Sequence, residues 1–156
     1  MPATQPKPES PEQDTRAQLI KAAEKLFGES GIDAVSLRQI NLEAGQKNSS
    51  AAHYHFGDKK TLIMAIYEAR MHSVNQRREK ILDEMATTGT EHDIRALTEA
   101  FACPIVEEMN STEGGSYYVR FMAQAIGHPQ LNLRELSRQQ SGSGLGRIMK
   151  LMQDAL

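Results

Sequence analysis

The 156-residue sequence lacks several features that define other classes of protein. Its single cysteine, Cys103, cannot form an internal disulfide, which fits a reducing compartment. The longest apolar run, residues 62–67, is far shorter than the roughly 20 residues that a membrane-spanning helix needs. Prolines and charges occupy the N-terminus, where a signal peptide would carry an apolar stretch. We therefore expect no membrane association and a cytoplasmic location.

The sequence also lacks the residue patterns of common catalytic and metal sites. It contains no recognisable nucleophile with its base, no glycine-rich phosphate loop and no paired-carboxylate site, so we expect neither an enzyme nor a bound cofactor. His53 and His55 are two residues apart, which places them about 200° apart around a helix axis and prevents them from holding one metal together. We expect no metal site, and we expect Cys103 to be a small buried apolar residue rather than a sensor of oxidants.

Helical periodicity is what the sequence does contain. Apolar residues recur every three or four positions, and no stretch alternates with the period of a strand, so we predict an all-α fold. Residues 1–13 carry four prolines and predict a disordered N-terminal arm. Helices are expected at about 14–30, 36–44, 51–56, 58–85, 94–109, 116–126, 131–139 and 145–156. Pro104 is expected to interrupt the fifth of these, because it removes a backbone donor.

Residues 36–60 predict two short helices joined by a tight turn. Ser36 is a suitable N-cap, since its hydroxyl can accept a backbone N–H of the first turn. Gly45 should end the first helix with positive φ, which costs a residue with Cβ about 1 kcal/mol or more. A residue between 48 and 50 can cap the second helix, 51–56, which begins with small residues and carries hydrogen-bonding groups outside. This composition suits a recognition helix that approaches base edges in the major groove.

The charge distribution supports this interpretation. The net charge of −2 divides into −2 over residues 1–14, +2 over residues 15–60 and −2 over residues 61–156. The positive balance thus falls on the predicted helix-turn-helix. Five basic residues stand at or near helix starts, where free N–H groups also attract phosphate: Arg16, Arg38, Lys47, Lys59 and Lys60. Without the surrounding motif, ordinary solvated charges would explain them equally well.

The region from Thr15 to Ala69 resembles the TetR family of transcriptional regulators. The resemblance rests on the segments AEKLFGESGIDAVS, EAG and YHFGDKKTLI, and it covers roughly a third of the chain closely. It implies a DNA-binding domain at 14–60, joined by a long fourth helix to a helical effector-binding and dimerisation domain at 61–156. The implied function is that of a homodimeric repressor, released from a palindromic operator on double-stranded DNA by a small apolar ligand.

The residues expected to contact DNA come from the pattern and the resemblance together. The resemblance places His53 and Tyr54 near the DNA backbone and gives His55 the role of bracing the recognition helix. Changes at 48–50 should alter which sequence is preferred, whereas a lysine at a phosphate should affect all sequences alike. The complete set is Arg16, Ser36, Arg38, Lys47, Asn48, Ser49, Ser50, His53, Tyr54, Lys59 and Lys60.

A ligand pocket is expected among the C-terminal helices. Methionine and aromatic side chains adapt to irregular apolar ligands, and a tyrosine hydroxyl can orient one. The candidates are Met64, Tyr67, Met71, Phe101, Tyr117, Tyr118, Phe121 and Met122. Each of these side chains could equally fill a helical core.

The sequence departs from the family pattern at three places. Asn41 stands where the family usually has alanine, a position kept small because the recognition helix packs closely against it. One extra residue lies between Gly45 and Phe56, which shifts the assignment of side chains to bases by one position. The sequence also ends before the further C-terminal helices that the family usually carries. These departures leave an alternative open, namely a helical protein-interaction module that retains the scaffold without specific DNA binding.

Overall fold

The computed structural model describes residues 11–111, 115–131 and 144–155. These residues form helices and no strand, so the all-α prediction is confirmed for the part of the chain that the structure describes. The helices are α1 (Pro11–Ser30), α2 (Leu37–Glu43), α3 (Ala51–Phe56), α4 (Lys59–Thr88), α5 (Ile94–Met109), α6 (Gly115–Gly127) and α8 (Gly144–Ala155).

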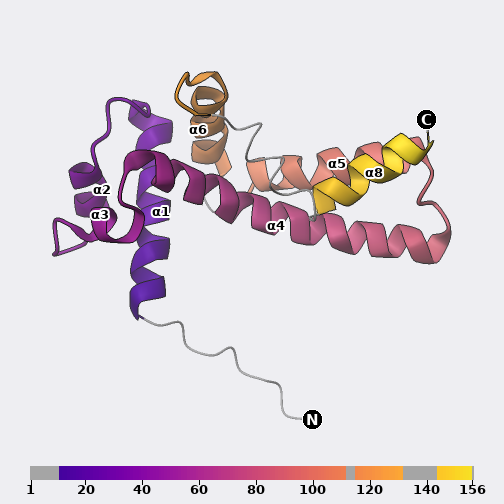
Figure 1. Ribbon diagram of the computed structural model, residues 1–156, viewed down its shortest axis with the longest axis horizontal. Helices are drawn as coiled ribbons and strands as arrows, with labels where there is room; N and C mark the ends of the chain where they lie inside the picture. The colour runs from indigo at the N-terminus through magenta and orange to yellow at the C-terminus, as the bar shows by residue number, and fades with distance from the viewer. Residues whose placement is uncertain (1–10, 112–114, 132–143, 156) are drawn as a thin grey trace, which may run out of the picture.

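The long helix α4 organises the molecule (Figure 1). Helices α1, α2 and α3 gather at its N-terminal end, whereas α5 and α8 lie along its C-terminal half. Helix α6 packs against α1 and therefore belongs spatially to the N-terminal end. No helix within the described ranges is long and apolar enough to cross a membrane.

The helix boundaries differ from the predicted ones by more than one residue in two places. Helix α1 begins at Pro11, so residues 11–13, which were assigned to a disordered arm, are helical. Proline suits the first position of a helix because the N–H that it lacks would have no helical partner there. Helix α4 extends to Thr88 and ends at Gly89. Apart from Leu131, the helix expected at 131–139 lies outside the described residues.

Two expectations about α5 were wrong. The helix runs through Pro104 without interruption, and two arginines of α4 also bind carbonyls of this stretch. Arg77 donates from Nη2 to the Pro104 carbonyl over 3.3 Å, and Arg78 donates from Nη2 to the Phe101 carbonyl over 2.9 Å. Cys103, expected to be buried, is exposed, because the face of α5 that carries it points away from α4.

The buried apolar side chains form two separate clusters. The first, which we call the proximal core, contains Leu19, Ala22, Ala23, Phe27, Ile32, Val35, Ile40, Ala51, Ala52, Phe56, Leu62, Ile63, Ala65, Ile66, Tyr67, Met71, Val74, Tyr118, Phe121 and Ala125. The second, the distal cluster, contains Leu82, Met85, Leu97, Ala100 and Ile148. The proximal core includes three residues of α6, so the predicted domain boundary after residue 60 does not separate two hydrophobic cores.

Candidate DNA interface and ligand cavity

The turn between α2 and α3 is built by short polar side chains and one glycine. Ser36 caps α2, since its hydroxyl accepts the Gln39 N–H at 3.3 Å while Gln39 Oε1 accepts the Ser36 N–H at 2.8 Å. This reciprocal pair is a capping box. Gly45 follows α2 with φ of +68°, a conformation that side chains with Cβ rarely adopt. Both features agree with the sequence prediction.

Asn41 holds the recognition helix α3 in place. The residue is buried on α2, and its amide donates to the Ser49 carbonyl while its Oδ1 accepts the Ala52 N–H at 2.8 Å. Ala52 lies in the first turn of α3, where backbone N–H groups lack helical partners. Ser50, the N-cap residue of α3, makes no side-chain capping bond. Asn41 therefore supplies the cap from the neighbouring helix, which accounts for a polar residue at a position where a small one was expected.

Most of the residues predicted to contact DNA lie on the surface of this unit. The exposed ones on or beside α2 and α3 are Ser36, Arg38, Lys47, Asn48, Ser49, Ser50, His53, Tyr54 and Lys60. His55 is half-buried, and its ring contacts those of Tyr54 and Phe56. The turn and α3 thus present a polar outer surface with side chains short enough for close approach to a groove.

The side chains of three predicted contact residues, Arg16, Tyr54 and Lys59, reach another helix or loop of the protein. The Arg16 guanidinium lies over the Phe56 ring, 5.3 Å from its centroid. The Tyr54 hydroxyl donates to the Glu12 carboxylate over 3.3 Å. Lys59 is half-buried, and its Nζ donates to the Ile32 carbonyl over 3.0 Å. Lys59 therefore ties the start of α4 to the loop that precedes α2.

A second feature is an apolar cavity of about 410 Å³ between α4, α5 and α6. Its lining residues are Tyr67, Met71, Ile105, Met109, Tyr118, Val119, Met122, Ala123 and Ile126. Four of the eight predicted pocket residues are among them, namely Tyr67, Met71, Tyr118 and Met122. The volume falls within the usual range for small-molecule sites.

The other four candidates lie elsewhere. Met64 is half-buried against the proximal core, and Phe121 is fully buried within it, with its ring centroid 6.2 Å from that of Phe27. Tyr117 is half-buried on α6, close to α1. Phe101 is partly exposed on α5 and covers the guanidinium of Arg78. Helical spacing alone does not separate residues that line a cavity from neighbours that face another helix.

Both cavity tyrosines have perturbed ionisation. Burial raises the pKa of the Tyr67 phenol, and burial also raises the pKa of the Tyr118 phenol strongly. Both phenols are therefore neutral at physiological pH and each offers an O–H donor. The cavity is thus apolar over most of its wall, with two potential hydrogen-bonding groups.

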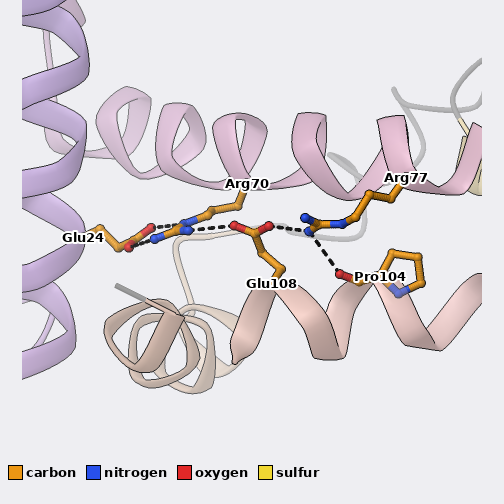
Figure 2. Close-up of polar contacts among 5 residues, drawn as sticks. All are labelled: Glu24, Arg70, Arg77, Pro104 and Glu108. Atoms are coloured by element: carbon orange, nitrogen blue, oxygen red, sulfur yellow. Dashed lines mark hydrogen bonds and ion pairs between the residues drawn. The ribbon is translucent and has the colours of Figure 1, made fainter. Parts of the chain in front are cut away.

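A charged network joins α1, α4 and α5 (Figure 2). Arg70 of α4 donates to Glu24 of α1 and, over 2.7 Å from Nη1, to Glu108 of α5. Arg77 donates to the other Glu108 oxygen and to the Pro104 carbonyl. Burial raises the pKa of the Glu108 carboxyl, whereas the hydrogen bonds and charges of the two arginines lower it. The arginines have the larger combined effect, so the pKa of Glu108 lies below its ordinary value. The network fixes the three helices relative to one another.

Gln124 is a residue that sequence reasoning did not single out. Its Nε2 donates to the Phe27 carbonyl at the end of α1 over 3.1 Å, and its Oε1 accepts the Ile32 N–H over 3.1 Å. It therefore connects α6 to the loop between α1 and α2. The sequence gives no direct signal for this contact, because its partners are backbone groups more than ninety residues away.

Helix α6 also approaches α1 closely at Gly28. A Cβ atom at this position would lie 2.7 Å from the Tyr117 carbonyl oxygen, a distance that real Cβ atoms essentially never show. Gly28 therefore permits close packing of the two helices. In the described part of the chain, no group of three or more His, Cys, Asp or Glu residues could hold a metal ion.

Comparisons with known proteins agree with this arrangement. The family profile described as "Bacterial regulatory proteins, tetR family" matches residues 19–66, and the profile "Tetracyclin repressor-like, C-terminal domain" matches residues 99–156. No curated protein matches the sequence significantly. A solved structure described as "Molecular basis for control of antibiotic production by a bacterial hormones" is similar in fold, with a TM-score of 0.58 and 18% identity over 94% of this chain and 72% of that chain.

The two matched regions correspond to the two features described above. The first contains the helix-turn-helix of α2 and α3, and the second contains most of α5 together with α6 and α8. A DNA-binding N-terminal region and a ligand-binding C-terminal region make the protein a DNA-binding transcriptional regulator. The chain belongs to the tetR family of bacterial regulatory proteins.

Proposed function

We propose that the protein is a homodimeric repressor that leaves a palindromic operator when a small apolar ligand enters the cavity between α4, α5 and α6. The observation that carries this proposal is the double role of α6. Met122, Ala123 and Ile126 line the cavity, whereas Gln124 holds the loop between α1 and α2. A ligand that displaces α6 must therefore also disturb the DNA-binding region.

The loop that Gln124 holds is the point where the two parts of the molecule meet. Lys59 at the start of α4 binds the Ile32 carbonyl of the same loop, and His128 beyond α6 lies 3.1 Å from the Asp33 carboxylate. A shift of α6 would change the position of α2 and, through Asn41, that of α3. Ligand binding and DNA binding would then be coupled, typically by about 1–3 kcal/mol.

Exposed apolar side chains support the dimer. Ile126 on α6 is 71% exposed and Met149 on α8 is 55% exposed, although both are large apolar residues. Pairing of such surfaces between two copies would remove them from water. A dimer with two-fold symmetry reads half-sites about 34 Å apart, one helical turn of DNA.

Selection from a pool of randomised DNA duplexes, at two salt concentrations, tests the DNA-binding half of this proposal. We expect enrichment of a two-fold symmetric motif. Affinity should fall as salt rises, because contacts with phosphate release counterions. Weak binding that enriches no sequence would instead support the interaction-module alternative.

Coupling can be measured before the natural ligand is known. The apolar fluorophore 1-anilinonaphthalene-8-sulfonate serves as the probe, and its affinity is measured with and without the selected duplex. Because coupling is reciprocal, DNA should weaken probe binding by roughly 5-fold or more. In Gln124→Ala, the ratio of probe affinities without and with DNA should fall close to one. Gln130→Ala changes an exposed glutamine nearby and should leave this ratio as it is in the wild type. A wild-type ratio of one would contradict release by a cavity ligand.

A further inference from the structure

The wall of the cavity between α4, α5 and α6 carries no charge. None of the described residues that line it is acidic or basic, and the only hydrogen-bond donors among their side chains are the hydroxyls of Tyr67 and Tyr118. Both phenols are neutral at physiological pH because burial raises the pKa of each. A charged ligand group enclosed by this wall would lose its hydration and gain no partner of opposite charge, which is strongly unfavourable. The enclosed part of a ligand should therefore be uncharged.

The charges closest to Tyr118 belong to a different site. The Arg70 guanidinium lies over the Tyr118 ring, 5.5 Å from its centroid, and pairs with Glu24 and Glu108. These three charged residues line a separate cleft of about 620 Å³ between α1 and α4, and none of them lines the cavity. Tyr118 therefore contacts the charged network with its ring, while the charges of that network compensate one another outside the cavity.

The Tyr118 hydroxyl is available to a ligand. Only 3% of the residue is exposed, and its ring also contacts the Phe121 ring, with 6.3 Å between the two centroids. No hydrogen bond joins the hydroxyl to a described residue. The oxygen is not sealed within the protein either, because the described polar atoms that are fully enclosed without a partner belong to other side chains. Since Tyr118 lines the cavity, packing holds its ring while its O–H is left to donate to a ligand there.

The enclosed end of the cavity is the polar one. Tyr67 and Tyr118 are 8% and 3% exposed, whereas the lining residues Met109 and Ile126 are 36% and 71% exposed. The mouth of the cavity is therefore aliphatic, and the phenols lie deeper. A ligand with a hydrogen-bond acceptor at its inner end satisfies a buried donor, and its hydrocarbon part covers the aliphatic mouth. In the opposite orientation, the buried O–H would be left without an acceptor.

We propose that the cavity binds an uncharged molecule whose inner end carries a ketone or ester oxygen, which accepts a hydrogen bond from the Tyr118 hydroxyl, and whose hydrocarbon part extends to Met109 and Ile126. This assignment rests on the proposed ligand-controlled function and specifies the class of ligand and its donor. Tyr118 lies on α6, the helix whose Gln124 holds the loop between α1 and α2. The hydrogen bond would thus act directly on the helix that connects the cavity to the DNA-binding region.

Three small molecules of similar size test the charge and the acceptor. Benzylacetone ends in a methyl ketone, butylbenzene in a hydrocarbon chain and hydrocinnamate in a carboxylate. Nuclear magnetic resonance of the methionine methyl groups in the DNA-free protein measures their affinities. The Met71 and Met122 signals report on the cavity, and the Met149 signal, from an exposed residue of α8, is the control that should not shift.

The wild-type protein should distinguish the ketone from the carboxylate. We expect benzylacetone to bind about tenfold more tightly than hydrocinnamate, or better, because the cavity wall offers a carboxylate no cation. Equal affinities, tighter binding of hydrocinnamate, or no shift of the Met71 and Met122 signals with any of the three molecules would overturn the assignment. This comparison needs no variant, so it holds whether or not the substitutions below fold.

Tyr118→Phe removes a single oxygen atom and tests the donor. It should weaken benzylacetone by roughly 2- to 10-fold and leave butylbenzene unchanged, because only the ketone accepts the hydrogen bond. Tyr117→Phe, the same substitution at the neighbouring residue of α6 that does not line the cavity, should alter neither affinity. An unchanged benzylacetone affinity in Tyr118→Phe, an equal loss for butylbenzene, or a loss confined to Tyr67→Phe would contradict Tyr118 as the donor.

Release of the selected duplex is measured separately, so that the two proposals can fail independently. If benzylacetone and butylbenzene release DNA equally well and Tyr118→Phe alters neither, the acceptor assignment fails while ligand-controlled release stands. If benzylacetone binds through Tyr118 but releases no DNA, the ligand class stands and ligand-controlled release fails.

Discussion

The proximal core and the distal cluster differ in size and in what they connect. Twenty buried residues from α1, α2, α3, α4 and α6 and the α1–α2 loop form the proximal core, whereas five from α4, α5 and α8 form the distal cluster. The proximal core includes part of the cavity wall, through Tyr67, Met71 and Tyr118, and reaches the recognition helix. The DNA-binding region and the cavity therefore share one packed unit, while the C-terminal end of α4 is stabilised separately (Figure 1).

The largest effects should come from deleting one large side chain in each cluster. Phe121→Ala should destabilise the protein by about 3–5 kcal/mol, and Leu97→Ala by about 2–5 kcal/mol, because both residues are fully buried. Hydrogen exchange should distinguish them. Phe121→Ala should raise exchange in α1 and α6, whereas Leu97→Ala should raise it in α5, α8 and the C-terminal half of α4. Equal acceleration in α1 for both variants would mean that the two clusters unfold together.

Glu108→Gln should break the charged connection between α1, α4 and α5. Loss of the carboxylate leaves the Arg77 charge poorly compensated and removes one of the carboxylates that pair with Arg70, at a cost of about 3 kcal/mol at pH 7. Chemical denaturation measures this cost. The exposed residue Glu99 provides the control Glu99→Gln, which should change little.

The pH dependence of the same variant is a further test. The folded-state pKa of Glu108 is lowered from its ordinary value of 4.5, so its stabilising contribution is present above that value. The contribution is lost as the pH falls through the folded-state pKa. The difference in the free energy of unfolding between wild type and Glu108→Gln should therefore be largest near neutral pH, and it should become smaller below about pH 4.5. A difference independent of pH would exclude the charge as its cause.

Gly28→Ala should separate α1 from α6 within the proximal core. The added Cβ meets the Tyr117 backbone, which cannot move independently of α6. We therefore expect the free energy of unfolding, measured by thermal or chemical denaturation, to fall by about 1–3 kcal/mol. Gly127→Ala is the matched control, since no atom lies within 4 Å of a Cβ at that position. Similar losses in both variants would show that close packing at Gly28 is unimportant.

Asn41→Ala should have the smallest effect on stability and the most local one. It leaves the Ala52 N–H without its cap, which typically costs about 1 kcal/mol. Because α3 would fray at its first turn, affinity for the selected duplex should also fall at fixed salt. Asn48→Ala removes an exposed side chain from the same turn and should cost less stability. If the amides of α3 exchange hydrogen as slowly in Asn41→Ala as in the wild type, Asn41 does not cap this helix.

The local parts of the fold were predictable because their causes are local. The Ser36 cap, the Gly45 turn and the apolar periodicity of α1 and α5 each depend on residues within a few positions. The same reasoning could not anticipate the uninterrupted helix at Pro104, since the packing of α5 against α4 and α8 is tertiary. It also could not place Cys103 on the exposed face of α5.

The sequence by itself determined the helical class, the helix-turn-helix and the kind of side chain available for a cavity. The tertiary structure decided which of those side chains line the cavity, because Phe121 and Tyr118 are only three residues apart on α6 and yet Tyr118 lines the cavity while Phe121 does not. It also decided that Asn41 caps α3, that Gln124 joins α6 to the α1–α2 loop and that Arg78 donates to neutral oxygens of Asn75 and Phe101. Periodicity specifies the buried face of a helix, but only packing specifies what that face meets.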